Sequence, residues 1–267
     1  MGADIKSLRN RIKSIDSTLH LTKAMGLVAS SKMKRALDGK NKASEYKNSL
    51  ENTIKLLLLS SDCKNSIYFN GANGEKTALV VIAGDRGLAG GYNANVFRLE
   101  KTFGKAERYA IGKRACDKLS KPQLSAEKFT YSDAKILADK LLKEFMSGEI
   151  SKVAVISTKY NSMISQEAVL EWILPFNIEP TQGNAGVIFE PDEKTVLDAV
   201  IPEYLAGVLV QKVRESFACE IVARRNAMDS AGKNATQMID ELQLEYNRAR
   251  QGAITQEITE IVAGSDA

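Results

Sequence analysis

Residue types that build chemical sites are scarce in this sequence. Histidine and tryptophan each occur once and cysteine three times among 267 residues. A lone histidine without neighbouring cysteines or carboxylates makes neither a zinc site nor a catalytic triad, so we expect His20 to be a packing residue on a helix. Cys63, Cys116 and Cys219 are widely spaced, which predicts reduced thiols rather than a disulfide framework or a metal site.

Long apolar runs are also missing. No stretch of about 18 apolar residues occurs, so the sequence predicts no membrane-spanning helix. Asp4 is acidic and no apolar segment follows the first basic residues, so we expect neither a signal peptide nor the Arg- and Ser-rich leader of an organelle import precursor. A net charge of +4 and a hydrophobic content of 44% are typical of a folded, soluble protein.

Proline is missing from the whole first part of the chain, where the apolar pattern is most regular. Apolar or small residues recur there in alternating steps of three and four, as in a coiled-coil seam. The sequence therefore predicts one long helix over residues 5–57, which needs a partner helix along its apolar face. The clearest seam positions are Ile5, Leu8, Ile12, Ile15, Leu19, Thr22, Gly26, Ala29, Met33 and Ala36.

A second long helix is predicted from Pro202, which suits a first helical turn, to Ala263. Residues 1–47 hold eleven Lys/Arg and four Asp/Glu, whereas residues 203–260 hold seven and nine. Opposite charge bias at opposite ends of one chain predicts that the two helices form an antiparallel pair. The second seam is less regular than the first, and its positions are Val210, Phe217, Ile221, Met228, Ala231, Ala235, Met238, Leu242 and Ala249.

Between these helices the pattern changes to short apolar runs that alternate with helical segments. This order predicts an α/β fold with a largely parallel, Rossmann-like sheet. Ser132 or Asp133 is expected to cap the helix that ends at Met146. The expected strands are 77–83, 107–111, 128–131, 152–158 and 169–174, and the expected helices are 92–103, 113–119 and 133–146.

Composition suggests the domain boundaries. We expect N- and C-terminal coiled-coil helices at 1–60 and 202–267 and a central α/β domain at 75–191. The segments 61–76 and 176–200 are polar and carry glycine and proline, so they are interpreted as linkers.

A glycine-rich segment, Gly84–Gly91, lies where a phosphate-binding loop would stand in an α/β domain. Its glycines do not match G-x-G-x-x-G, and no G-x-x-x-x-G-K-[ST] occurs, so a tight turn is the better interpretation. An α/β enzyme that oligomerises through its helices is the main alternative. A nucleic-acid-binding coiled coil is a third hypothesis, although the basic segment Ser30–Arg35 has no interleaved aromatic residues.

The C-terminal end differs from the rest of its helix. No Lys or Arg follows Arg250, and Ile254, Ile258, Ile261 and Val262 place apolar side chains on more than one side. An exposed apolar helix end is typical of a protein-binding site.

Three segments resemble the γ subunit of F-type ATP synthases: residues 5–36, the run Asp85–Asn93, and residues 223–263. Their order and spacing agree with that family along the whole chain. Ala89 stands where several relatives carry cysteine, Gly26 replaces a better helix former, and no chloroplast-type cysteine-pair insert is present.

The resemblance implies a function without a catalytic site or cofactor in this chain. The paired helices would be the central rotor shaft inside a ring of three α and three β subunits, coupling ion-driven rotation to the β catalytic sites. The α/β domain would join the ε subunit and the membrane c-ring of a proton-translocating enzyme. We expect a peripheral position on the cytoplasmic face of a bacterial plasma membrane, or alternatively on the matrix or stroma side in an organelle, and no nucleic-acid partner. The contacts implied by position are Lys23, Met25, Arg250, Gln251, Thr255 and Glu257 toward β, with Ile258, Ile261 and Val262 in an apolar bearing.

Overall fold

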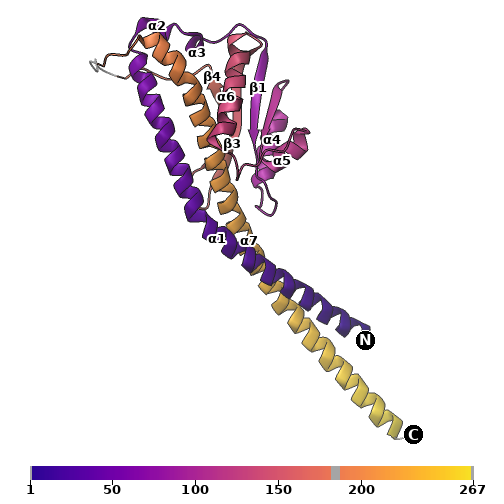
Figure 1. Cartoon of the computed structure of the whole chain (residues 1–267). Helices are drawn as coiled ribbons and strands as arrows, with labels where there is room; N and C mark the ends of the chain where they lie inside the picture. The colour runs from indigo at the N-terminus through magenta and orange to yellow at the C-terminus, as the bar shows by residue number, and fades with distance from the viewer. Residues whose placement is uncertain (1, 182–186, 266–267) are drawn as a thin grey trace. The chain divides into compact units, whose positions relative to one another are not determined.

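The computed structural model describes residues 2–181 and 187–265. The chain divides into a helix-pair unit, residues 1–30 with 224–267, and a sheet unit, residues 31–223. Figure 1 shows the elements in order of the chain. The helices are α1 (Gly2–Leu57), α2 (Ser61–Lys64), α3 (Ile67–Asn70), α4 (Tyr92–Thr102), α5 (Lys113–Leu119), α6 (Tyr131–Met146) and α7 (Glu193–Ser265), and the strands are β1 (Lys76–Ile82), β2 (Glu107–Ile111), β3 (Ile150–Tyr160) and β4 (Gln166–Leu174).

In the helix-pair unit, the first part of α1 packs antiparallel against the second part of α7. Gly26 faces Met228, while Gly232 faces the side chains of Leu19 and Thr22, so the two helices run in opposite directions. Leu19, Thr22 and Ala29 are buried, and the intervening helix surface is largely exposed. The predicted seam of α1 and its antiparallel pairing are therefore confirmed.

The seam of α7 agrees with the prediction at Met228, Ala235 and Leu242, which are buried, and differs from it at Met238. Met238 is 42% exposed, and its neighbour Ile239 is the half-buried residue. Gly232 and Tyr246 are also half-buried on α7. Neither residue is apolar enough to be recognised as a seam position from the sequence. The expectation for Met238 was wrong because an apolar residue can stand on the solvent side of a helix whose buried face is built from small residues.

The sheet unit holds a four-stranded sheet in the order β2-β1-β3-β4. β1 pairs in parallel with β2 and with β3, and β4 pairs antiparallel with β3 as a hairpin. The largely parallel α/β sheet is confirmed, with β4 as its antiparallel edge. The two central strands, β1 and β3, carry continuous apolar runs because helices cover both faces.

Two apolar layers cover the sheet. On one face, Val80 and Val155 pack with α6 and with the unit's portions of α1 and α7, including Ile54 and Leu205. On the other face, Leu79, Val81 and Ile156 pack with α4 and α5. Alternate residues of one strand therefore point to opposite layers, as the two-residue period of a strand requires.

Several predicted boundaries are corrected by the structure. α7 begins at Glu193, and Pro202 lies inside it. The start is explained by Asp192, whose carboxylate accepts hydrogen bonds from the backbone N–H and hydroxyl of Thr195 at 2.9 and 2.7 Å. The segment 61–76, interpreted as a linker, contains α2 and α3, and both Cys63 and Tyr68 are buried there.

The expected strand at Lys128–Tyr131 is not formed. Phe129 is buried in an irregular segment, Thr130 is the N-cap of α6, and Tyr131 is already helical. Thr130 and Asp133 form a capping box, so the expectation that Ser132 or Asp133 caps the helix was wrong by a few residues.

The remaining expectations concern scarce residues. His20 is not a packing residue: its side chain is 75% exposed and its Nε2 lies 3.7 Å from Asp16. The three cysteines are free and buried. Within residues 2–181 and 187–265, none of the helices is both long and apolar enough to cross a membrane.

Candidate functional site

The end of α7 presents the predicted contact residues to solvent. Arg250, Gln251, Thr255 and Glu257 are all exposed. The apolar residues that follow are exposed as well: Ile258 by 56%, Ile261 by 68% and Val262 by 55%. The Thr255 hydroxyl donates to the carbonyl oxygen of Gln251 at 2.9 Å, a bond within the helix that leaves the outer surface open.

This exposure follows from the lengths of the two helices. Because the helices are antiparallel and rise equally per residue, the same number of residues can be counted backwards from Gly26 and forwards from Met228. This count places Ile5 of α1 beside residue 249 of α7. Ala253 is the last half-buried residue along α7 among those described. Beyond it, α7 has passed the first described residue of α1, Gly2, and Ile258 and Ile261 are exposed on a helix end of the kind that binds other proteins.

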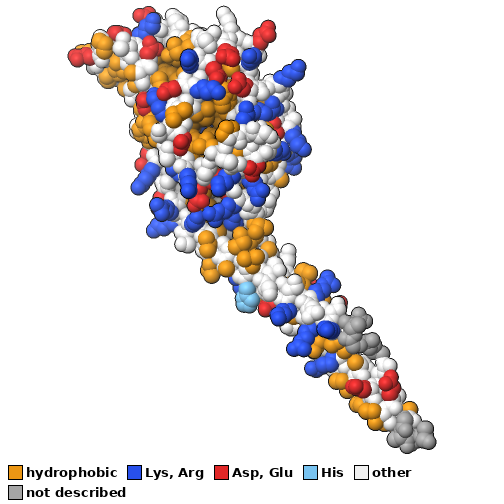
Figure 2. Space-filling model, turned by 45° about the vertical axis from the view of Figure 1, so that its right-hand side comes forward, with side chains coloured by type: hydrophobic (Ala, Val, Ile, Leu, Met, Phe, Trp, Pro, Cys, Tyr) orange, Lys and Arg blue, Asp and Glu red, His pale blue; other side chains and the backbone are white. Residues whose placement is uncertain are grey.

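A second exposed apolar surface surrounds the predicted residues Lys23 and Met25 on α1. Lys23 is exposed and Met25 is half-buried. Their neighbours Leu21, Leu27 and Val28 are 58%, 72% and 55% exposed, and Figure 2 shows hydrophobic side chains gathered beside the single histidine. Sequence analysis missed these three residues because it followed only the inward seam; their off-seam apolarity was the available signal.

Small seam residues leave a groove between the two helices next to this surface. The groove has a volume of about 640 Å³, and its lining includes Gly26 and Gly232, which carry no side chains of their own. Charged side chains stand at its rim, among them Lys23, Asp229 and Lys233. The full lining is Thr22, Lys23, Gly26, Leu27, Ser30, Arg225, Asn226, Met228, Asp229, Gly232, Lys233 and Thr236.

The structure does not bring all the predicted contacts into one site. Met25 lies near the level of Met228, whereas Arg250 stands roughly 30 Å farther along α7 at 1.5 Å per residue. The helix-pair unit therefore presents two separate surfaces, one around Met25 and one from Arg250 to Val262.

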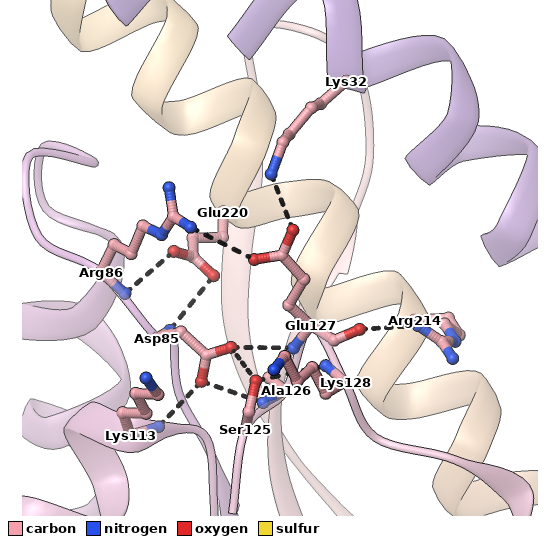
Figure 3. Close-up of polar contacts among 10 residues, drawn as sticks. All are labelled: Lys32, Asp85, Arg86, Lys113, Ser125, Ala126, Glu127, Lys128, Arg214 and Glu220. Carbon is pink, nitrogen blue, oxygen red and sulfur yellow. Dashed lines mark hydrogen bonds and ion pairs between the residues drawn. The ribbon is translucent and has the colours of Figure 1, made fainter. Parts of the chain in front are cut away.

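In the sheet unit, the glycine-rich loop is held by Asp85. Its carboxylate accepts hydrogen bonds from the Ser125 hydroxyl at 2.6 Å and from the backbone N–H groups of Lys113, Ala126 and Glu127, each at 2.9 Å (Figure 3). Burial favours the neutral acid, but the hydrogen bonds from Ser125 and the three backbone groups outweigh it and lower the pKa of Asp85.

Glu127 links three parts of the sheet unit. It accepts a hydrogen bond from Lys32 Nζ of α1 at 2.7 Å and lies 3.7 Å from the guanidinium of Arg86 (Figure 3). The Lys32 hydrogen bond is the main reason that the pKa of Glu127 is lowered, against an opposing effect of burial. Arg214 of α7 donates to the carbonyl oxygens of Glu127 and Phe129 at 3.4 and 2.7 Å. This network was missed because its members are far apart in sequence.

The first three N–H groups of the same loop, which would bind a phosphate, already donate to side chains of this chain. The N–H groups of Asp85 and Arg86 point to the carboxylate of Glu220, and the N–H of Gly84 donates to Asn93. The turn interpretation of Gly84–Gly91 therefore agrees with the local hydrogen bonding. Among the described residues, no cluster of three or more His, Cys, Asp or Glu side chains is arranged to hold a metal ion.

Comparisons with known proteins agree with this architecture. The family model described as ATP synthase matches residues 4–267. The ATP synthase gamma chain of Ruminococcus albus is 40% identical, with 98% of each chain covered. A chain of the Euglena gracilis mitochondrial ATP synthase has a TM-score of 0.72 at 15% identity, covering 100% of this chain and 95% of that one. A chain of the rotor of the same enzyme has a TM-score of 0.68 at 16% identity, covering 95% and 100%. The two structures agree with the fold, and the sequence match over nearly the full length shows that this chain belongs to the ATP synthase gamma chain family.

Proposed function

We propose that this chain is the central-stalk rotor of a proton-translocating F-type ATP synthase, coupling rotation to conformational change at the catalytic sites of the β subunits. The observation that carries this proposal is the end of α7, which continues beyond its partner helix and exposes apolar side chains without a Lys or Arg after Arg250. The nucleotide chemistry belongs to the surrounding ring, and this chain supplies no catalytic residue or cofactor.

Coupling requires an asymmetric shaft. A ring of three equivalent sites has no reason to bind nucleotide unequally, but a rod with different faces has a different interaction free energy with each β conformation. By reciprocity, nucleotide occupancy biases the orientation of the rod as much as the rod biases nucleotide affinity. The charged Lys23 and the apolar Leu21 and Val28 lie close together on α1, which supports such a difference between faces.

Each contact surface has an assigned role in the proposal. Lys23 and Met25 face a β subunit through α1. Four residues of α7 engage a β-subunit loop: Arg250, Gln251, Thr255 and Glu257. The apolar residues Ile258, Ile261 and Val262 form a bearing surface, where strong ion pairs would trap a single angle of rotation.

The partners follow from the division of the chain. The shaft is assigned to residues 1–60 and 202–267, inside three α and three β subunits. The domain at 75–191 contacts the ε subunit and the membrane c-ring. We propose a peripheral position on the cytoplasmic face of a bacterial plasma membrane, or alternatively on the matrix or stroma side in an organelle.

Native mass spectrometry tests this assignment. An affinity tag is inserted in the exposed loop at 121–123, because residues 61–76 include buried side chains. Recovery of one tagged chain with three α, three β and one ε subunit is the expected result. Recovery of homo-oligomers alone would contradict the proposal.

A further inference from the structure

The sheet has a topological switch point between β1 and β3, the position at which open α/β sheets form a ligand-binding crevice. The chain passes from β1 to β2 on one side and later enters β3 on the other side, so the direction of strand order reverses between β1 and β3. In open α/β sheets, ligands bind outside the carboxyl ends of the strands at this point. The relevant backbone here is the loop after β1 and the last residues of β3.

α7 occupies this crevice with three buried polar side chains. The Ser216 hydroxyl accepts a hydrogen bond from the N–H of Thr158 at 3.0 Å, and Glu215 accepts one from the N–H of Tyr160 at 3.1 Å. The exposed fractions are 0% for Ser216 and 7% for Glu215. β3 extends beyond its pairing with β1, and α7 satisfies the donors left at that end.

Glu220 fills the other side of the crevice. Its carboxylate is 1% exposed and accepts from the N–H of Asp85 at 3.4 Å and from the N–H of Arg86 at 3.3 Å (Figure 3). Consecutive backbone N–H groups in a loop after a strand are the donors that bind anions in other α/β domains. A carboxylate of the chain therefore stands where a bound anion would lie.

The loop backbone is shaped for this carboxylate. A Cβ at Gly84 would lie 2.7 Å from Glu220 Cδ, so any larger residue there would displace the carboxylate from this position. Asp85 holds the loop from the opposite side through its four hydrogen bonds. The Tyr92 hydroxyl also donates to the carbonyl oxygen of Ser216 at 2.9 Å, which fixes α4 to the same turn of α7.

We propose that the carboxylate of Glu220 takes the place that a bound phosphate would occupy at the switch point between β1 and β3. Glu220 is thereby a positioning residue that fastens α7 to the α/β domain. Glu220 thus binds α7 to the α/β domain at the backbone of Asp85 and Arg86. On the proposed function, rotation of the α/β domain passes to α7 at this point. The fastening itself is a property of the chain alone, so it is tested without the assembled enzyme.

The test measures amide hydrogen exchange of the loop in the full chain by mass spectrometry, with Glu220→Ala, Glu220→Gln and the unchanged chain. Removal of the carboxylate should speed exchange in the peptide covering residues 83–90 at least tenfold, and Glu220→Gln should give an intermediate rate because one acceptor oxygen remains. Sodium acetate, added to Glu220→Ala, should slow the exchange again by occupying the vacated position, whereas sodium chloride at equal ionic strength should not.

The control is Glu245→Ala, an exposed glutamate of the same helix, which should leave loop exchange unchanged. Equal loop exchange in all variants would overturn the proposal, and so would equal effects of acetate and chloride. If Glu220→Ala does not fold, Glu220→Gln decides alone: faster loop exchange supports the proposal and unchanged exchange rejects it. Failure of this test leaves the subunit composition of the complex untouched, so the two proposals fail separately.

Discussion

Gly26 of α1 lies directly against Met228 of α7: a Cβ at Gly26 would stand 3.7 Å from the Cβ of Met228. That distance is ordinary van der Waals contact, so the glycine is not needed for the helices to meet. Its cost is conformational, because glycine in a helix interior loses more backbone freedom on folding than alanine does.

Gly26→Ala should therefore stabilise the chain. We expect a gain in the free energy of unfolding of about 0.5–1 kcal/mol from the reduced freedom of the unfolded chain. Urea unfolding followed by circular dichroism measures it. Gly39→Ala is the matched control in the same helix, since its Cβ would meet no atom within 4 Å. A loss of stability in Gly26→Ala with a gain in Gly39→Ala would show that the contact with Met228 is tighter than ordinary packing.

Ala235→Trp should separate the paired helices. Ala235 is 5% exposed, and an indole ring at that position overpacks the seam, which costs about 1–3 kcal/mol. Helicity at 222 nm and the midpoint of thermal unfolding report the change. The exposed neighbour Asn234 provides the control, because Asn234→Trp places the same ring in solvent. Equal unfolding midpoints for the two variants would place Ala235 outside the seam.

Arg250→Ala combined with Gln251→Ala should lower coupled ATP turnover in the assembled enzyme, because both side chains are assigned to a β-subunit contact. Both are exposed on α7, so the isolated chain should keep its helicity and unfolding midpoint. Proton pumping and ATP hydrolysis, measured on the same membranes, test the coupling. Gln243→Ala, another exposed position of α7, serves as the control, and normal pumping in the double variant would remove the pair from the contact surface.

Asp85→Asn should lower the free energy of unfolding at neutral pH and make that free energy less dependent on pH in the acid range. The pKa of Asp85 is lowered in the folded chain, so its ionised form contributes stability above the unfolded pKa near 3.8, which is lost as pH falls through the folded pKa. Because the group is only half-buried, we expect a loss of about 1–2 kcal/mol at neutral pH.

Urea unfolding at a series of pH values from neutral to acid checks this prediction. The difference between the unchanged chain and Asp85→Asn should shrink as the pH falls below the unfolded pKa. Asp240→Asn, at an exposed position, provides the control. A constant difference across the series would mean that the charge of Asp85 does not hold the loop.

The long helices could be predicted because their signal is local and repeated. The seam of α1 carries apolar residues at nearly every inward position, whereas α7 uses Gly232 and Ala235 where the backbones approach. Glycine gives no hydrophobic signal, so Gly232 was not predicted as a seam position, and Met238 was placed inward although it is exposed. The start of α7 was missed for a different reason: Pro202 suggested a helix start, whereas Asp192 caps the helix ten residues earlier.

The polar network of the sheet unit could not be predicted from sequence spacing. Asp85 bonds to residues 125–127, and Glu220 meets the same loop from α7, so each contact depends on the completed fold. Asp85 and Arg86 were noticed only as part of a motif. Their hydrogen-bond partners explain why these residue types stand there.

The occupation of the crevice by α7 also limits what can be engineered into this fold. A nucleotide-binding pocket between β1 and β3 would require the removal of the Ser216 and Glu220 side chains. Their removal would also break the hydrogen bonds that hold α7 to the domain. Ligand binding and helix attachment draw on the same backbone donors, so the domain can serve one of these purposes only by giving up the other.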